Sequence, residues 1–453
     1  MKKTMALVLL LVLSLVLSGC SLVVKDPAVD ARQVILDING ETVDKAAFTA
    51  NYNAMMNQEY QMQQMYQMYG MQAPEIVPED VMNRAKDQTI RDIIIRQKAA
   101  ELKLNELTED EEKELQTQVD SEWQSTLDQV KQYYFADTKL EGEELDSAIE
   151  HQAEDLGISR ELTEAGLRET FVSGKLEKDA TKEVTVPEED IKADFDAKVE
   201  ANKASYEADP NAYGSAINGG QTVYFAPEGY RMVKQVLIKF LPEDQTKIDA
   251  IKADQSGAQT ALTSAVEAKA ANAEALLKEG ISEDEKKTLE EQATQLQATL
   301  DEAQQKVDKL AQDLLAAQNA GYEAILPKAQ EVYNKAKTED FDALAKEFNE
   351  DTGMPERGYA VREGFSSFDE AFVKPAMALA NVGDVAEPSQ GMYGYYIVQY
   401  AADVTPGPVD YEAVKGNLHD ALLTTKKSQA WEDAIKLWTD SAKVESFLDR
   451  MSN

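Results

Sequence analysis

Hydrophobic and polar positions alternate along most of this chain with the period of an α-helix. Apolar residues recur every three or four positions, which places them on one side of each helix. The helices predicted in this way lie around 79–104, 108–135, 143–155, 160–182 and 187–207. Turn-forming residues then fill 209–222 and predict a linker. A mostly helical region over 33–222 is therefore expected, opened by a short strand at 33–39.

The first helix of that region has an unusual composition. It begins after Asp44, which suits an N-cap, and it is rich in Met, Gln and Tyr between Tyr52 and Met71. Its apolar positions have helical spacing, so we expect them to form the buried face of an amphipathic helix. The alternative is a soft surface that adapts to varied polypeptides, because Met side chains repack easily.

Residues 244–321 predict a long helical hairpin. From Leu289 to Ala317 the apolar positions alternate in steps of four and three residues, which is the pattern of a coiled-coil seam. Gly280 interrupts the pattern, and Ser282 with Glu285 matches a capping box that starts the second arm. Two antiparallel arms of about 30 residues would each extend roughly 45 Å.

Composition and charge exclude several kinds of function. The chain has 453 residues, enough for two or three domains, and a formal net charge of −37 at pH 7. Such a charge disfavours nucleic-acid binding, which needs basic patches. The chain contains two His and one Cys, too few for a zinc site built from imidazole and thiolate ligands. We therefore predict neither a cofactor nor a metal.

The N-terminus predicts export and a lipid anchor. Two lysines precede an apolar run at 5–17, which is too short to span a bilayer and is typical of a signal peptide. The run ends in Leu17-Ser18-Gly19-Cys20, which resembles the lipobox of bacterial lipoproteins. The resemblance implies a signal peptide at 1–19, a tether at 20–32 and a lipid on Cys20 that anchors an extracytoplasmic protein to the cell membrane.

Four segments in the second half of the chain match one family in order. They are Val233–Lys239, Phe341–Asp351, Phe372–Pro388 and Tyr393–Val398. These segments resemble the first strand, a helix and loop, a later helix and turn, and the last strand of parvulin-type peptidyl-prolyl isomerases. The resemblance implies a small parvulin-like α/β domain over 229–403, with the hairpin inserted in it.

The region before that domain resembles the helical domain of PrsA-like and SurA-like extracytoplasmic foldases. The similarity is carried by Ile38–Lys45, Ile-Asn-Gly-Glu-Thr-Val-Asp-Lys, at the start of 33–222. It implies a helical chaperone domain, with the C-terminal helix at 409–447 returning to it. The predicted fold class is therefore α+β and mostly helical: a SurA-like chaperone domain plus a parvulin-like domain interrupted by an antiparallel coiled-coil hairpin.

The two active-site histidines of the parvulin family are replaced in this chain. Their positions are occupied by Gln235 and Tyr396, while Asp351 matches the family's acidic or cysteine position. Gln and Tyr can each donate and accept hydrogen bonds, so a network with Asp351 is conceivable. The resemblance implies these three residues as catalytic candidates, with isomerase activity that is weak or lost.

An apolar wall for the substrate proline is also implied. Phe372 falls on the family's pocket Phe and Phe368 on its pocket Met, with Met377 and Tyr359 nearby. Rotation about an X-Pro bond crosses a barrier of roughly 18–20 kcal/mol. Catalysis of that rotation needs no nucleophile, only a pocket that binds the twisted amide better than the planar forms.

These observations predict a membrane-anchored foldase or holdase that acts on unfolded or newly secreted polypeptides. Two other functions stay open. One is a fully active prolyl isomerase. The other is an interaction or scaffold lipoprotein that docks a protein partner through the hairpin tip and has no foldase role.

Overall fold

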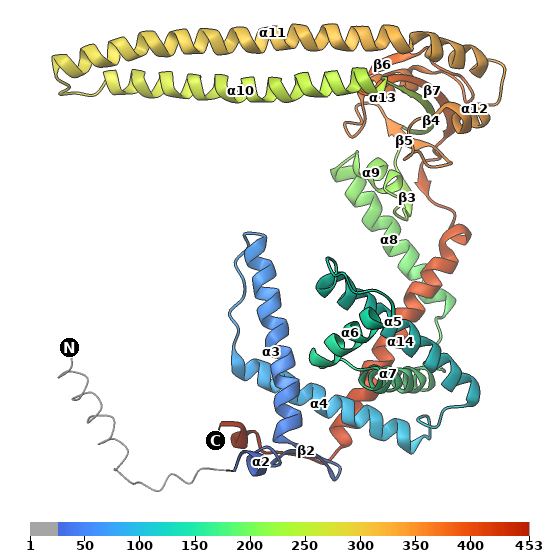
Figure 1. Cartoon of the computed structure of the whole chain (residues 1–453). Helices are drawn as coiled ribbons and strands as arrows, with labels where there is room; N and C mark the ends of the chain where they lie inside the picture. The colour runs from blue at the N-terminus through green and yellow to red at the C-terminus, as the bar shows by residue number, and fades with distance from the viewer. Residues whose placement is uncertain (1–25, 453) are drawn as a thin grey trace, which may run out of the picture. The chain divides into compact units, whose positions relative to one another are not determined.

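The computed structural model describes residues 26–452, and these form two compact units. The first unit contains the chain up to Pro187 and again from His419 onward; the second spans Glu188–Leu418. Helices dominate both units and the sheets are small (Figure 1), which confirms the predicted mostly helical α+β class. Cys20 and the predicted signal peptide lie outside the described residues.

The first unit is organised around a three-stranded antiparallel sheet in the order β2-β1-β9. Strand β1 (Val34–Ile38) turns tightly into β2 (Glu41–Asp44), with positive φ at Asn39 and Gly40. Strand β9 (Val444–Ser446) pairs with the other edge of β1. The sheet therefore unites the first and the last strands of the chain.

Helices of the first unit pack on that sheet and on one another. The central cluster joins β1 to Phe48 of one helix and to Ile90, Ile93 and Ile94 of the next. A capping box between Thr108 and Glu111 starts one of these helices. The helices are α2 (Pro27–Asp30), α3 (Lys45–Met68), α4 (Pro78–Glu101), α5 (Glu109–Tyr134), α6 (Gly142–Asp155), α7 (Arg160–Ala180), the later part of α14 (Tyr411–Ser441) and the 3-10 helix η1 (Leu448–Ser452).

Helix α3 is only partly buried, so the expected buried face is wrong for its second half. Asp44 caps the helix by accepting a hydrogen bond from the amide of Ala47 at 2.9 Å, and Phe48 is fully buried. Near the other end Met62 and Tyr69, which belong to the expected buried face, are 40% and 70% exposed, and the neighbouring Met65 and Met68 are 49% and 81% exposed. The buried cluster stops near the middle of α3, so the later Met and Tyr side chains have no core to enter.

The second unit contains a four-stranded antiparallel sheet in the order β5-β4-β7-β6. The strands are β4 (Tyr230–Lys239), β5 (Tyr359–Arg362), β6 (Ser389–Gly391) and β7 (Gly394–Asp403). One face packs on helix α12 (Phe341–Phe348) and on the hairpin base. The other face packs on helix α13 (Glu370–Ala378). Side chains on successive residues of a strand point to opposite faces, so this sheet has two separate apolar layers.

The predicted linker at 209–222 is partly structured. Helix α8 (Glu188–Ala208) ends just before this segment, and helix α9 (Ala212–Asn218) lies within it. Tyr213 of α9 is buried between the rings of Tyr206 and Tyr230, and Tyr230 donates a hydrogen bond to the Pro210 carbonyl at 2.7 Å. Beside them, β3 (Phe225–Ala226) pairs with β8 (Gly407–Pro408). The turn formers here shape a packed corner instead of a free linker.

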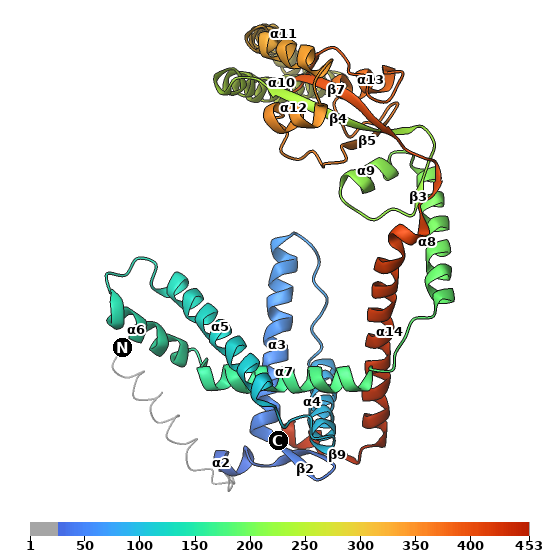
Figure 2. The ribbon, with the colours of Figure 1, turned by 90° about the vertical axis from the view of Figure 1, so that its right-hand side faces the viewer.

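Two long helices form the expected hairpin, α10 (Pro242–Leu276) and α11 (Glu283–Ala336), which lie side by side (Figures 1 and 2). Gly280 has φ +86° in the turn between them. Ser282 and Glu285 form the predicted capping box. Asn272 is buried between the arms, where its amide donates to the Leu289 carbonyl at 3.2 Å. A buried amide paired in this way fixes the register of two helices.

The base of the hairpin belongs to the core of the second unit. Ile248 and Ala317 lie in the same cluster as Val236 and Ile397 of the sheet. Gly321 packs closely against Phe240: a Cβ atom at position 321 would lie only 2.8 Å from the Phe240 ring. The free part of the hairpin is therefore shorter than the predicted 244–321.

Candidate functional site

A pocket of about 500 Å³ lies on the sheet face that α13 covers. Strands β4 and β7 bring two of the candidate residues to it. Their register pairs Gln235 with Val398 and Leu237 with Tyr396, so Gln235 and Tyr396 share one face of the sheet. The lining residues are Gln235, Leu237, Lys239, Asp351, Tyr359, Ser366, Ser367, Phe368, Asp369, Phe372, Met392, Tyr393 and Tyr396.

Asp351 is the centre of one hydrogen-bond network in the pocket. Its Oδ2 accepts from Gln235 Nε2 at 2.6 Å and from the Tyr359 hydroxyl at 2.9 Å. Its Oδ1 accepts from the Gly353 amide at 2.9 Å. Burial, followed by the hydrogen bond to Asp351 and its charge, raises the pKa of Tyr359, so that hydroxyl stays a donor. The network holds Gln235 and Tyr359 in fixed orientations.

Gln235 keeps one polar atom without a partner. The residue is only 5% exposed, and its Oε1 accepts no hydrogen bond within the described part of the chain. An unpaired buried acceptor is costly, of the order of 1–3 kcal/mol. Because Gln235 lines the pocket, this oxygen is a candidate acceptor for an N–H or O–H group of a ligand.

Tyr396 belongs to a second network, centred on Asp369. Burial, followed by the charge of Asp369, raises the pKa of the Tyr396 hydroxyl. Asp369 also accepts from the Ala371 amide at 3.0 Å, which caps α13, and from the Met392 amide at 2.5 Å. Gly391 leaves room for the Tyr396 ring, because a Cβ at that position would lie 2.1 Å from Tyr396 Cε2.

An aromatic wall closes one side of the pocket. The ring of Phe368 lies 4.8 Å from that of Tyr359 and 5.5 Å from that of Phe372. The Phe372 ring lies 5.9 Å from that of Tyr396. Met377 does not line the pocket; it packs beneath the wall in the core cluster. A wall of this kind suits a compact apolar group such as a proline ring.

The structure thus brings together six of the seven candidate residues, and it adds others. Asp369, Lys239, Ser366 and Ser367 also line the pocket and were not among the candidates. Asp369 had a signal in the sequence, since an Asp directly before a helix is a common N-cap. The two serines lie in a loop whose course nothing in the sequence pattern fixes.

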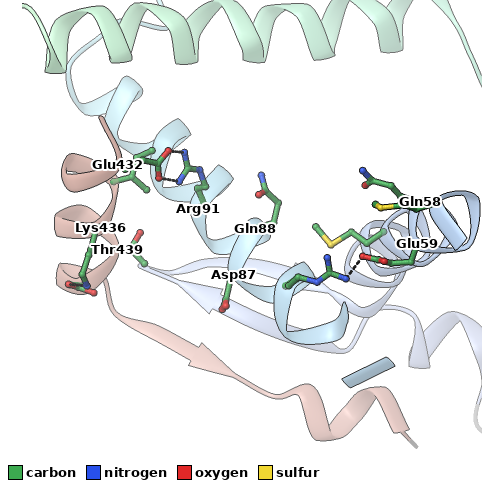
Figure 3. Close-up of a pocket in the computed structure, with 13 residues that line it drawn as sticks. Gln58, Glu59, Asp87, Gln88, Arg91, Glu432, Lys436 and Thr439 are labelled. Atoms are coloured by element: carbon green, nitrogen blue, oxygen red, sulfur yellow. Dashed lines mark hydrogen bonds and ion pairs between the residues drawn. The ribbon is translucent and has the colours of Figure 1, made fainter. Parts of the chain in front are cut away.

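A second cavity, of about 640 Å³, lies in the first unit among α3, α4 and α14 (Figure 3). Four of its charged side chains form two ion pairs, Arg91 with Glu432 at 2.6 Å and Arg84 with Glu59 at 2.5 Å. In residues 26–452, moreover, no group of three or more His, Cys, Asp or Glu side chains could hold a metal ion. The first pocket is the better candidate because it contains Gln235, Asp351 and Tyr396, the residues that the sequence singled out.

Comparison with known proteins finds foldases among the relatives in sequence. The chain is 40% identical over 106 residues to the foldase protein PrsA 2 of Listeria monocytogenes, which is 22% of this chain and 36% of the relative. It is 28% identical over 131 residues to the foldase protein PrsA of Clostridium botulinum, 27% of this chain and 39% of the relative. The matches thus cover less than half of those relatives. No family model matches the chain.

Two solved structures that align with most of this chain are those of a SurA-like chaperone and a PrsA foldase. A SurA-like chaperone of Campylobacter jejuni aligns over 91% of this chain and 98% of its own, with 11% identity and a TM-score of 0.27. The foldase protein PrsA of Streptococcus pneumoniae aligns over 90% and 93%, with 14% identity and a TM-score of 0.23.

Proposed function

We propose that this protein, which is similar in sequence to PrsA foldases, is an extracytoplasmic foldase that captures unfolded polypeptides and binds their X-Pro segments in the pocket around Asp351. One observation carries the proposal. A pocket of about 500 Å³ is lined both by the aromatic wall of Phe368 and Phe372 and by two side chains that can form hydrogen bonds, Gln235 and Tyr396. That arrangement offers a proline ring an apolar contact and its amide polar contacts.

The chemistry favours binding over fast catalysis. Acceleration requires that the pocket bind the twisted amide better than either planar form. In the structure Gln235 and Tyr396 serve separate networks, one through Asp351 and the other through Asp369. We therefore propose a prolyl-peptide binding site with weak isomerase activity.

Restoring the histidines tests this proposal. Gln235→His combined with Tyr396→His is expected to raise isomerisation of a short X-Pro peptide with little change in its affinity. Each tenfold gain needs about 1.4 kcal/mol of additional transition-state stabilisation. Exchange NMR on the peptide measures the rate, and Phe372→Ala, which removes part of the wall, is the control that should lose binding. If the parent already matches the double variant in rate, Gln235 and Tyr396 are a working alternative to the histidine pair.

The exposed end of α3 supports a holdase role in the same protein. Met65, Met68 and Tyr69 present apolar surface that no part of their own unit covers, and Met side chains adapt to varied partners. Suppression of client aggregation by the purified chain tests that role. The alternative is a scaffold that docks a partner at the hairpin tip, and it predicts no suppression of client aggregation. Its support is Leu277, an apolar residue beside the turn that is 83% exposed.

We also propose that a lipid on Cys20 anchors the protein. Support comes from the Leu17-Ser18-Gly19-Cys20 motif. Within residues 26–452, no helix has the length and apolarity that crossing a membrane requires. Cys20→Ala is expected to abolish incorporation of labelled palmitate and to move the protein from the membrane fraction to the soluble one. Ser21→Ala is the matched control, and palmitate labelling of the Cys20 variant would contradict the proposal.

A further inference from the structure

The hairpin helix α11 makes a direct contact with the pocket rim. Tyr322, on the part of α11 that rejoins the second unit, donates a hydrogen bond from its hydroxyl to the Gly391 carbonyl at 2.8 Å. Its ring lies 4.9 Å from that of Phe240 and 5.5 Å from that of Tyr395. A polar contact set between two aromatic contacts holds the side chain in one place.

The backbone that Tyr322 holds is the two-residue turn between β6 and β7. Gly391 ends β6 and Gly394 begins β7, so Met392 and Tyr393 form the turn and line the pocket. On one side the Met392 amide donates to Asp369 at 2.5 Å. On the other, the Gly391 backbone lies directly against the Tyr396 ring. The turn therefore contacts both the Asp369 carboxylate and the Tyr396 ring.

We propose that Tyr322 is a positioning residue for the pocket, through which the hairpin helix fixes the β6–β7 turn and with it Asp369 and Tyr396. The ligand-binding part of this inference rests on the proposed prolyl-peptide function; the positioning part does not. Burial, followed by the negative charge of Asp369, raises the pKa of Tyr322, so its hydroxyl remains a hydrogen-bond donor at neutral pH. The hairpin is thus joined to the pocket at its base.

Removal of the Tyr322 hydroxyl oxygen tests the inference. Tyr322→Phe keeps the aromatic packing and removes only the hydroxyl. Tyr333→Phe is the matched control, because Tyr333 is a half-buried tyrosine of the same helix that packs on the same core cluster but lies away from the turn. Both variants are made in the full mature chain, and their melting temperatures are compared first.

Two measurements then separate positioning from general stability. Hydrogen exchange followed by NMR reports on the Met392 amide, which is bonded to Asp369. Titration with the peptide Ala-Ala-Pro-Phe reports on the pocket. In Tyr322→Phe we expect the Met392 amide to exchange about tenfold faster and the peptide to bind about three- to tenfold more weakly, the usual range for loss of one hydrogen bond. Tyr333→Phe should match the parent in both.

Each outcome decides between the possibilities. Unchanged Met392 exchange in Tyr322→Phe overturns the inference, as does an equal change in Tyr333→Phe, which would indicate general loosening of α11. A third outcome is that Tyr322→Phe speeds exchange of the Met392 amide while the parent protein binds no proline peptide. That outcome supports positioning by Tyr322 and overturns the prolyl-binding function of the pocket.

Discussion

Replacement of Gly391 by Ala is expected to displace Tyr396 and to destroy the pocket. The new Cβ would lie 2.1 Å from Tyr396 Cε2 and 2.5 Å from Asp369 Oδ2, both far inside van der Waals contact. Overpacking of this kind typically costs about 1–3 kcal/mol, and here the shift falls on two pocket side chains at once. We expect a melting temperature several degrees below the parent and no measurable binding of a proline peptide.

Double variants at these two positions show whether the steric explanation is right. Tyr396→Val removes the ring that the new methyl group would strike, so combined with Gly391→Ala it should be less destabilised than the sum of the single changes, by roughly 1–3 kcal/mol. Tyr396→Phe keeps the ring and should give no rescue. Denaturant unfolding measures the free energy of the parent, of each single variant and of both double variants; simple additivity with Tyr396→Val would contradict the explanation.

Deletion of the whole predicted hairpin, 244–321, is expected to unfold the second unit, whereas a shorter deletion should not. The longer cut removes Ile248 and Ala317 from the core cluster and also the Gly321 contact with Phe240. Loss of a buried Ile side chain alone costs about 2–5 kcal/mol. The expected result is a chain whose second unit shows no cooperative unfolding transition.

The matched deletion removes 254–311 and joins the ends with a short Gly-Ser linker. It keeps Ile248, Ile251, Leu314 and Ala317, the hairpin residues that contact the core. Because the free arms bury mainly their own seam, this variant should unfold cooperatively close to the parent temperature in a calorimetric scan. Equal stability of the two deletions would show that the hairpin base contributes nothing to the core.

The arms of the hairpin could be predicted because their pattern is local. A seam repeating every three and four residues, a Gly in the turn and a capping box each act within a few positions. The boundary at 321 could not be predicted, since it depends on Phe240, a residue 81 positions earlier that packs on Gly321. A contact between residues so far apart in the sequence produces no repeating pattern from which it could be predicted.

The difference between local patterns and long-range contacts also explains which pocket residues were predicted and which were missed. Gln235 and Tyr396 were placed by matching whole strands, whose alternation fixes the facing side chains. Asp369 was missed because its role depends on the Met392 amide, which a separate turn brings to it. Met377 was included in the wall as an apolar residue near Phe372, but it packs in the core cluster and does not line the pocket.

The pairing of β1 with β9 sets an order of assembly. Glu188–Leu418 is one continuous stretch of chain, so it can complete its core as soon as that stretch has been delivered. The first unit cannot do so, because β1 pairs with a strand that begins only at Val444. In a polypeptide delivered from its N-terminus, the part made first must therefore wait for the part made last. Until then Ile35, Leu36 and Ile38 lack one neighbouring strand, and the protein itself resembles a client in need of protection from aggregation.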